Sequence, residues 1–420
     1  MTGKLFLGLA MALACVSSPA ADPTPYNVRT FGAKGDGATK DTAALQSALD
    51  ACATNGGGIV QVPAGAYLTG SLVLGPNTTL QLDAQATLNG SPDIADYPII
   101  NTRWEGEFRD GHCALLSASN ADHVTIAGPG GIVGPPPALS HLRNPRGPVI
   151  IELTGCTNAV LKNFSSQYQQ LWSVHLLFCQ HLIATNLTLR TTGANGDGFD
   201  VDSCRDVLIE NCDVNTGDDA ISLKSGRGLA AQNLGRPCED ITIRDCKLVS
   251  SLYAALGLGT EMSGGIRNVR LENCVIAGHQ NAIFIKSRDG RGGYMENITG
   301  ENLTVNPSPT FIGIDLVKKG IQATDPVPGD VEKWARVGKL TFNHIRLNQV
   351  ADLIAAKNVP PQRPLDGLTL TDITGTCGRG ISLANMVNVK LADLKVTGYT
   401  GPLVTVDNVK GTGLDNPPAQ

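Results

Sequence analysis

The sequence predicts an all-β chain that winds into a single-stranded right-handed parallel β-helix, with a short helix capping its N-terminal end. A short motif that alternates apolar and polar residues, as half-buried strands do, recurs along the chain. One such coil cannot bury its apolar face, whereas stacked coils share one continuous core. The clear copies of the motif begin 23, 25, 34, 28 and 29 residues apart, at Asn158, His181, Asp206, Asp240, Asn268 and Asn297.

The ends of each copy support a solenoid of stacked coils. Asn or Asp stands at both ends of copies such as Asn158 to Asn163 and Asp206 to Asn211. These residue types tolerate left-handed backbone in turns. The consensus of leucine-rich repeats is absent, and a propeller would need longer units of four strands. A parallel β-helix therefore fits best.

The first 21 residues are predicted to be a signal peptide. An apolar run from Leu5 to Val16 follows a lysine, and small residues end at a cleavage point near Ala20 or Ala21. The run is too short for a membrane span. Lipid attachment at Cys15 is the minor alternative. We therefore expect export to the periplasm or the medium.

Residues 22–420 are predicted to form one elongated domain. Near its start, residues 41–52 carry apolar side chains at positions i, i+3, i+4 and i+7, which is the pattern of an amphipathic helix. A helix there would cover the open end of the solenoid and block pairing of exposed strand edges. The apolar face consists of Leu45, Ala48, Leu49 and Cys52.

Ten cysteines remain after removal of the signal peptide, and no CxxC pair suggests a zinc or redox site. Several of them occupy repeat positions, where a buried small apolar residue is expected, so we predict at most one or two disulfides. The net charge is -5 and no basic run occurs, so nucleic acid is not an expected partner. No later apolar stretch is long enough to cross a membrane.

The strongest chemical signal is a group of aspartates that flanks one repeat copy. Asn195-Gly-Asp-Gly-Phe-Asp200 precedes this copy, and Gly217-Asp-Asp-Ala-Ile-Ser-Leu-Lys224 follows it. Equivalent positions on successive coils stack about 4.8 Å apart, so Asp197 is expected beside Asp218 and Asp219. Carboxylates this close repel one another, which raises one pKa and leaves a protonated acid beside charged neighbours. Glycosidic hydrolysis needs this pair of states, while spacing alone also allows a polar turn ladder or a calcium site.

Further motifs follow in order along the chain: Arg103-Trp-Glu-Gly106, Gly259-Thr-Glu-Met-Ser-Gly-Gly265, Ile285-Lys286 and Gly290-Arg-Gly-Gly293. Together with the two aspartate motifs, they resemble glycoside hydrolase family 28, the polygalacturonases and rhamnogalacturonan hydrolases. The similarity runs from about Val28 to Val305, and the combination of motifs is specific.

The resemblance implies that Asp218 is the general acid, and that Asp197 and Asp219 hold and activate the attacking water. It also implies a single displacement that inverts the anomeric configuration, with no metal and no organic cofactor. Lys286 resembles the cation that grips a substrate carboxylate in the family. The expected substrate-binding residues are Asn195, Lys224, Tyr253, Glu261, Lys286 and Arg291.

Three departures from the family pattern stand out. Ala254, next to Tyr253, stands where the family has a histidine, and Phe284 stands where it has an arginine. Ala220 and Ser250 stand where the family has the two cysteines of a disulfide beside the active site. Loss of the arginine removes a bidentate clamp for a carboxylate at one subsite. A subsite that holds a neutral sugar such as rhamnose would not need this clamp, so the departures point away from plain homogalacturonan.

The expected function is polygalacturonase-like: an inverting hydrolase of α-1,4-galacturonosyl linkages in pectin. Exo action is an option, because Thr260-Glu-Met-Ser-Gly-Gly265 resembles the corresponding motif of exo-acting members of the family. One alternative is a hydrolase of rhamnogalacturonan or another modified pectin. Another is a catalytically impaired carbohydrate-binding β-helix. The expected partner is a pectin-type polysaccharide or oligosaccharide, and the chain is expected to act as a monomer.

Overall fold

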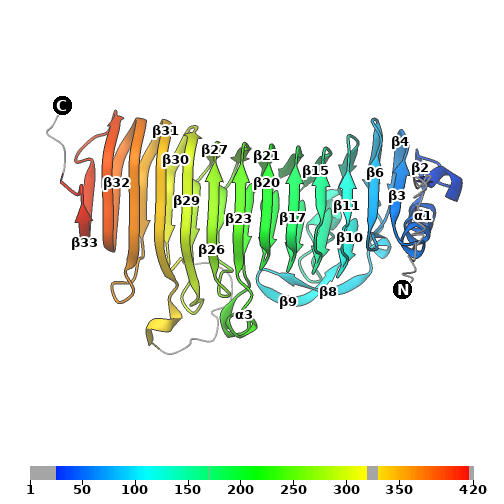
Figure 1. The fold of residues 1–420 in the computed structure, drawn as a ribbon, viewed down its shortest axis with the longest axis horizontal. Coiled ribbons are helices and arrows are strands. Elements are labelled where there is room, and N and C mark those ends of the chain that lie inside the picture. Colours follow the sequence, from blue (N-terminus) through cyan, green and yellow to red (C-terminus); the bar gives the residue numbers. More distant parts are fainter. Residues whose placement is uncertain (1–24, 170, 319–329, 416–420) are drawn as a thin grey trace, which may run out of the picture.

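The computed structural model describes residues 25–169, 171–318 and 330–415, and the predicted signal peptide with Cys15 lies outside these residues. The described chain winds as a parallel β-helix, which confirms the predicted fold class. Its coils follow one another along one long axis (Figure 1). Each strand pairs in parallel with the equivalent strands of the neighbouring coils, so three ladders run along the solenoid.

The strands of the three ladders alternate along the chain. The first ladder contains β5 (Leu72–Val73), β10 (Leu116–Ser119), β13 (Ile151–Thr154), β16 (Val174–Leu177), β19 (Phe199–Asp202), β22 (Ile221–Lys224), β25 (Ala254–Leu258), β28 (Asn281–Lys286) and β30 (Ser308–Asp315). The second contains β1 (Tyr26–Asn27), β3 (Gly58–Val62), β6 (Thr78–Leu82), β11 (Thr125–Ala127), β14 (Val160–Lys162), β17 (Gln180–Thr185), β20 (Arg205–Glu210), β23 (Cys238–Arg244) and β26 (Ile266–Glu272). The third contains β2 (Asp36–Lys40), β4 (Gly65–Thr69), β7 (Ala86–Gly90), β12 (Gly131–Val133), β15 (Ser165–Gln169), β18 (Thr188–Thr192), β21 (Asp213–Thr216), β24 (Lys247–Ser250) and β27 (Val275–Gly278).

Toward the C-terminal end, long strands continue from one ladder into the next. β29 pairs with both β26 and β27, and β31 pairs with both β29 and β30. These strands are β29 (Tyr294–Val305), β31 (Arg336–Lys357), β32 (Leu365–Thr397) and β33 (Val404–Thr412). An antiparallel hairpin of β8 (Ile99–Trp104) and β9 (Glu107–His112) leaves the solenoid and lies along one of its edges (Figure 1).

The predicted repeat copies coincide with the second ladder, and their end residues adopt left-handed backbone as expected. Asn158 and Asn163 have φ of 54° and 62°, and Asp206 and Asn211 have φ of 55° and 53°. The side chains also stack from coil to coil, since the amide Nδ2 of Asn186 donates to Oδ1 of Asn163 at 3.1 Å. Each turn therefore repeats the same backbone geometry in successive coils.

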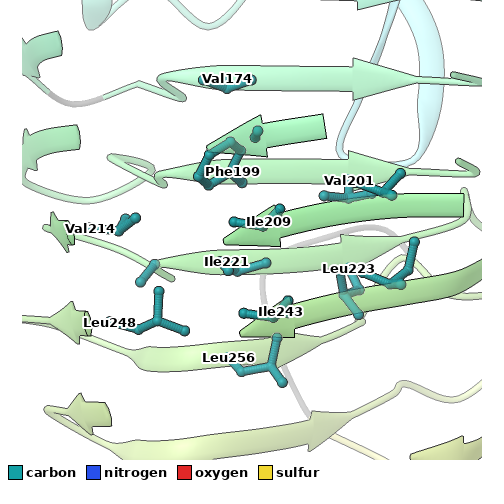
Figure 2. Close-up of a cluster of buried hydrophobic side chains, with 14 of the residues drawn as sticks. Val174, Phe199, Val201, Ile209, Val214, Ile221, Leu223, Ile243, Leu248 and Leu256 are labelled. Carbon is teal, nitrogen blue, oxygen red and sulfur yellow. The ribbon is translucent and has the colours of Figure 1, made fainter. Parts of the chain in front are cut away.

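The core consists of identical positions stacked along each ladder. In the first ladder Val174, Phe199, Ile221 and Leu256 are register partners in successive strands, and each is at most 1% exposed (Figure 2). Burial of each such side chain contributes about 1.5–3 kcal/mol. Stacking makes one continuous core from coils that could not bury their apolar faces alone.

The N-terminal end is closed by α1 (Thr42–Thr54), which confirms the predicted capping helix. Its buried residues are the four predicted from the sequence, Leu45, Ala48, Leu49 and Cys52. The remaining helical segments are short: η1 (Val28–Phe31), η2 (Ile94–Asp96), α2 (Pro137–Ser140), α3 (Gly228–Leu234) and η3 (Asp330–Lys333). None of the helices in the described residues is long and apolar enough to span a membrane.

The cysteines of the described residues, from Cys52 to Cys377, are all unpaired, and all except Cys113 are buried. Several stack along the turns, and the N–H of Cys179 points at Sγ of Cys204 at 3.3 Å. They thus occupy core positions of the repeat as small apolar side chains, as the sequence suggested.

Candidate active site

The register between β19 and β22 brings the predicted aspartates together. Asp200 pairs with Ser222, so Asp197 and Asp219 occupy equivalent positions on adjacent coils. One carboxylate oxygen from each of Asp197, Asp218 and Asp219 lies within 4.8 Å of the others. Close approach here depends on Gly217, because a side chain at that position would meet the carbonyl oxygen of the preceding coil at 2.1 Å. The expected proximity of the three carboxylates is confirmed.

Asp218 combines a poised carboxyl group with access to a cavity. Its oxygens accept hydrogen bonds from the backbone N–H groups of Asn195 and Asp219, each at 2.9 Å. Burial, followed by the negative charge of Asp219, raises the pKa of Asp218 to about 6. Asp218 can therefore carry a proton at mildly acidic pH, as a general acid must.

Asp197 and Asp200 form a buried group with Lys224. The Lys224 Nζ lies 2.6 Å from Oδ1 of Asp200 and 4.0 Å from Oδ2 of Asp197, and it sits over the ring of Trp172 at 4.1 Å. Burial, then the charges of Asp200 and Asp218, raises the pKa of Asp197 well above its usual range. Burial also raises the pKa of Asp200 to about 6. Because these carboxyl groups interact strongly, their protons belong to the cluster as a whole.

Asp219 is held between two donors. The Nζ of Lys286 donates to its Oδ2 at 2.8 Å, and the backbone N–H of Ala254 donates to its Oδ1 at 3.0 Å. The position where the family has a histidine thus still contributes a donor, through its backbone. These two hydrogen bonds fix the orientation of the Asp219 carboxyl group beside the cavity.

The carboxylates open into a cavity of about 140 Å³. Four of the predicted substrate-binding residues line it: Asn195, Lys224, Glu261 and Lys286. Tyr253 is not among the lining residues but lies near the carboxylates, because the charge of Asp218 adds to burial in raising the Tyr253 pKa. The Arg291 side chain is fully buried and does not line the cavity. The other lining residues are Glu105, Trp172, Asp197, Asp218, Asp219, Ser222, Gly259, Thr260, Arg288 and Lys318.

Trp172 and Lys318 were not expected from the sequence to line the cavity, and Ser222, although it lies in the second aspartate motif, had no predicted role. Trp172 is one of three tryptophans in the chain and stands just before β16, so its rarity was a usable signal. Ser222 faces outward beside Lys224 in β22, which strict strand alternation would have indicated. Lys318 follows β30 in no recognisable motif, and only the folded chain brings it to the cavity.

The β8–β9 hairpin covers one side of this site. The Thr102 hydroxyl donates to Oε1 of Glu152 at 2.9 Å, and Nη1 of Arg103 lies 2.8 Å from Oδ1 of Asp202. The Trp104 ring packs on that of Trp172, with 4.3 Å between centroids. The partners belong to β13 and β19 and to the turn before β16, and the hairpin turn reaches one coil further, because the backbone N–H of Arg227 donates to the carbonyl oxygen of Gly106 at 3.2 Å. The hairpin therefore lies over the outer face of the first ladder, beside the cavity.

The three aspartates could in principle hold a cation. Two ammonium groups already face them, however, since Lys286 lies 2.8 Å from Asp219 and Lys224 lies 4.0 Å from Asp197. A calcium ion also takes 6–8 oxygen ligands, more than these three carboxylates offer without waters. The donor set therefore fits a cluster neutralised by lysines better than a divalent cation site.

The profile of Glycosyl hydrolases family 28 matches residues 52–345. The chain belongs to this family. A probable polygalacturonase of Vitis vinifera is 33% identical over 291 residues, which cover 66% of this chain and 59% of that protein. An exo-poly-alpha-D-galacturonosidase of Dickeya chrysanthemi is 27% identical over 335 residues, which cover 67% of this chain and 55% of that protein. The chain thus spans less than two thirds of the length of these curated relatives.

A solved structure supports the family's fold for this chain. The family 28 exopolygalacturonase of Yersinia enterocolitica superposes with a TM-score of 0.84, covering 95% of this chain and 80% of that one. At 20% sequence identity, this similarity establishes the shared β-helix alone.

Proposed function

We propose that the chain hydrolyses α-1,4-galacturonosyl linkages in pectin, as a polygalacturonase-like enzyme. The observation that carries the proposal is the cluster of Asp197, Asp218 and Asp219, with oxygens within 4.8 Å of one another beside a cavity. A family 28 match over most of the chain and relatives named polygalacturonase support it. The partner is accordingly a pectin-type polysaccharide or oligosaccharide.

The residues divide the chemistry between them. Asp218, whose pKa of about 6 keeps it protonated in mild acid, donates its proton to the oxygen of the leaving sugar as the glycosidic bond breaks. Asp219 and Asp197 orient a water molecule, whose oxygen bonds to the anomeric carbon while its proton passes to a carboxylate. Proton exchange with solvent then returns the carboxyl groups of the cluster to their starting protonation states. No metal takes part.

We infer exo action from the position of the hairpin. Thr102, Arg103 and Trp104 contact Glu152, Asp202 and Trp172, and we infer that the hairpin stops a polymer from continuing across these coils. The substrate then enters by a chain end. The initial products from polygalacturonate should therefore be short, and the viscosity of the solution should fall slowly. Early release of a broad ladder of oligomers would contradict exo action.

Inversion of configuration rests on the family resemblance. Inverting carboxyl pairs in general stand about 6.5–9.5 Å apart, whereas the aspartate oxygens here approach within 4.8 Å. Proton NMR during the first turnovers decides the point. The β-anomer as first product supports inversion, and the α-anomer overturns it.

The second candidate is a hydrolase of rhamnogalacturonan or another modified pectin, which Phe284 in place of the family's arginine favours. Reducing-end assays on polygalacturonate and rhamnogalacturonan separate the two. Ultraviolet absorbance from unsaturated products, with loss of activity in chelator, would instead indicate a lyase. Binding without any product would indicate an impaired carbohydrate-binding β-helix.

We also infer that the chain is exported, on the strength of the apolar run from Leu5 to Val16 and the small residues that follow it. N-terminal sequencing of the mature protein tests this inference, and a start near Ala21 or Asp22 is expected. Retention in a membrane fraction that is lost in Cys15→Ala would show lipid anchoring instead.

A further inference from the structure

Two cations on one wall of the cavity, Lys318 and Arg288, have no carboxylate within ion-pair distance among the described residues. The Nε of Arg288 is buried and without a hydrogen-bond partner. The other two cations of the cavity are engaged, because Lys286 pairs with Asp219 at 2.8 Å and Lys224 pairs with Asp200 at 2.6 Å. Positive charge that the protein itself does not neutralise is thus concentrated at Lys318 and Arg288.

The ring of Phe284 holds this charge in place. The Nζ of Lys318 lies 5.1 Å from the ring centroid and that of Lys286 lies 5.4 Å from it, both within the range of cation–π attraction. Phe284 is only 6% exposed. Its register partners are Gly257 and Gly313, so neither adjoining strand has a side chain in register with the ring. The Asp219 carboxylate fills the space beside Gly257, and the Asn281 side chain fills that beside Gly313.

The electrostatics of Lys318 indicate an anionic ligand. Burial lowers the pKa of Lys318, and repulsion from Lys286 and Arg288 lowers it further, while Asp315 acts in the opposite direction. The Asp315 carboxylate is itself bonded to the side chain of Asn358 at 3.0 Å. A carboxylate placed between Lys318 and Arg288 would offset the repulsion and give the buried Arg288 Nε a partner.

We propose that Lys318, seated on Phe284, and Arg288 together bind the carboxylate of a uronate sugar in the substrate. They supply the positive charge that the family provides through an arginine at the position of Phe284. This inference rests on the proposed function, since it names the sugar class that the same cavity accepts. Phe284 then supports an acidic subsite, and its presence does not indicate a neutral sugar.

Binding measurements on an inactive background test the proposal apart from catalysis. In Asp218→Asn protein, added Lys318→Met should weaken trigalacturonate binding about 10-fold in calorimetry, which corresponds to about 1.4 kcal/mol. The carboxyl-reduced trisaccharide should bind both proteins equally. Lys247→Met, at an exposed lysine of β24, is the matched control and should change neither affinity.

The outcomes separate the two proposals. Equal losses for the acidic and the reduced trisaccharide, or no loss for either, would overturn the carboxylate site. If Lys318→Met weakens binding of the acidic trisaccharide alone, but the native protein hydrolyses no pectin, the carboxylate site stands and the proposed enzymatic function is wrong. In the active protein, Lys318→Met should raise KM for polygalacturonate with little change in kcat, and Phe284→Leu should do so more weakly. Unchanged melting temperatures exclude a general folding defect, and Arg288→Gln provides an independent second test.

Discussion

At the residue scale, the proposed catalytic group consists of largely buried carboxyl groups at the edge of a cavity. The cluster has two lysines near it, one paired with Asp219 and one with Asp200. The pKa of Asp218 nevertheless stays raised, because burial and the charge of Asp219 together outweigh Lys286. A general acid must be protonated before it reacts, and a carboxyl group that is costly to ionise in the folded chain meets this requirement.

Replacement of Asp218 tests this balance between activity and stability. Asp218→Asn should lower kcat by roughly 10²–10⁴-fold, the usual contribution of a general acid. The raised pKa means that the folded state binds the proton more tightly, so wild-type stability falls as pH rises from about 4 to about 6. At pH 7 the variant should be the more stable protein, by on the order of 2 kcal/mol. Melting curves at pH 4 and pH 7 check this, and equal stability at both would contradict it.

The pH dependence of catalysis should follow the same group. Activity should fall as pH rises through about 6, where Asp218 loses its proton. Tyr253→Phe should leave this midpoint in place, because a phenol is neutral at that pH. A pH profile of kcat/KM for both proteins makes the measurement. An alkaline limb displaced well above 7 would assign the acid to a different group.

A second buried ion cluster lies under the hairpin and serves stability. Glu152 is 3% exposed and is bonded by Nη2 of Arg146 at 2.8 Å and by Nδ1 of His175 at 3.0 Å. Burial alone would raise its pKa, but the charges of Arg146 and His175 lower it to about 2. Glu152→Gln should therefore destabilise the fold by about 3–5 kcal/mol, because Arg146 is left buried without its counter-charge.

A matched control separates this cost from loss of charge in general. Glu210 forms a partly exposed pair with Arg244 at 2.6 Å, so Glu210→Gln should cost at most about 1 kcal/mol. Urea unfolding at pH 7 compares the two variants with the parent. Similar midpoints for both would show that the Glu152 cluster adds no special stability.

Much of the site could be predicted at this scale, for reasons that differ by residue. Asp197, Asp218 and Asp219 sit at fixed offsets from a regular strand, so the coil spacing alone placed them together. Arg291 and Lys318 belong to loops between coils, where no periodicity constrains direction. The folded chain buries the former and turns the latter into the cavity.

At the element scale, the β8–β9 hairpin covers one side of the candidate site. The motif Arg103-Trp-Glu-Gly106 was expected near the cleft, and its turn places Glu105 in the cavity lining. The sequence could not show that the hairpin also packs on the neighbouring coils. That packing depends on contacts of Trp104 and Arg103 with residues about 70 and 100 positions later.

Shortening the hairpin should change the product pattern. Ile99 and His112 are paired in register, so a short Gly-Ser link can replace residues 100–111. Asp202→Asn added to this variant avoids leaving that carboxylate buried without Arg103. The open cleft should release longer oligogalacturonates early and reduce viscosity faster per bond cleaved. Asp202→Asn alone is the control, and an unchanged product ladder in a folded, active variant would refute the blocking role.

At the scale of the whole molecule, the regular repeat made the fold predictable. Every coil repeats the same buried positions and left-handed turns, so the pattern remained visible despite spacings from 23 to 34 residues. The last coils were fainter in the sequence. There β31 and β32 run through the turns as long strands.

A solenoid of this kind is stable as a single molecule only if its ends are closed. α1 buries Leu45 fully and packs on β1, β3, β5 and β6, where the first coil would otherwise present unpaired strand edges. Leu45→Asp should cost several kcal/mol, since it places a charge without a partner in the core. The loosened cap should expose those edges, so the variant should also self-associate. Light scattering measures this, with Asp50→Ala on the exposed face of α1 as the control. A destabilised variant that stays monomeric would show that the cap supplies core packing alone and does not guard the edge.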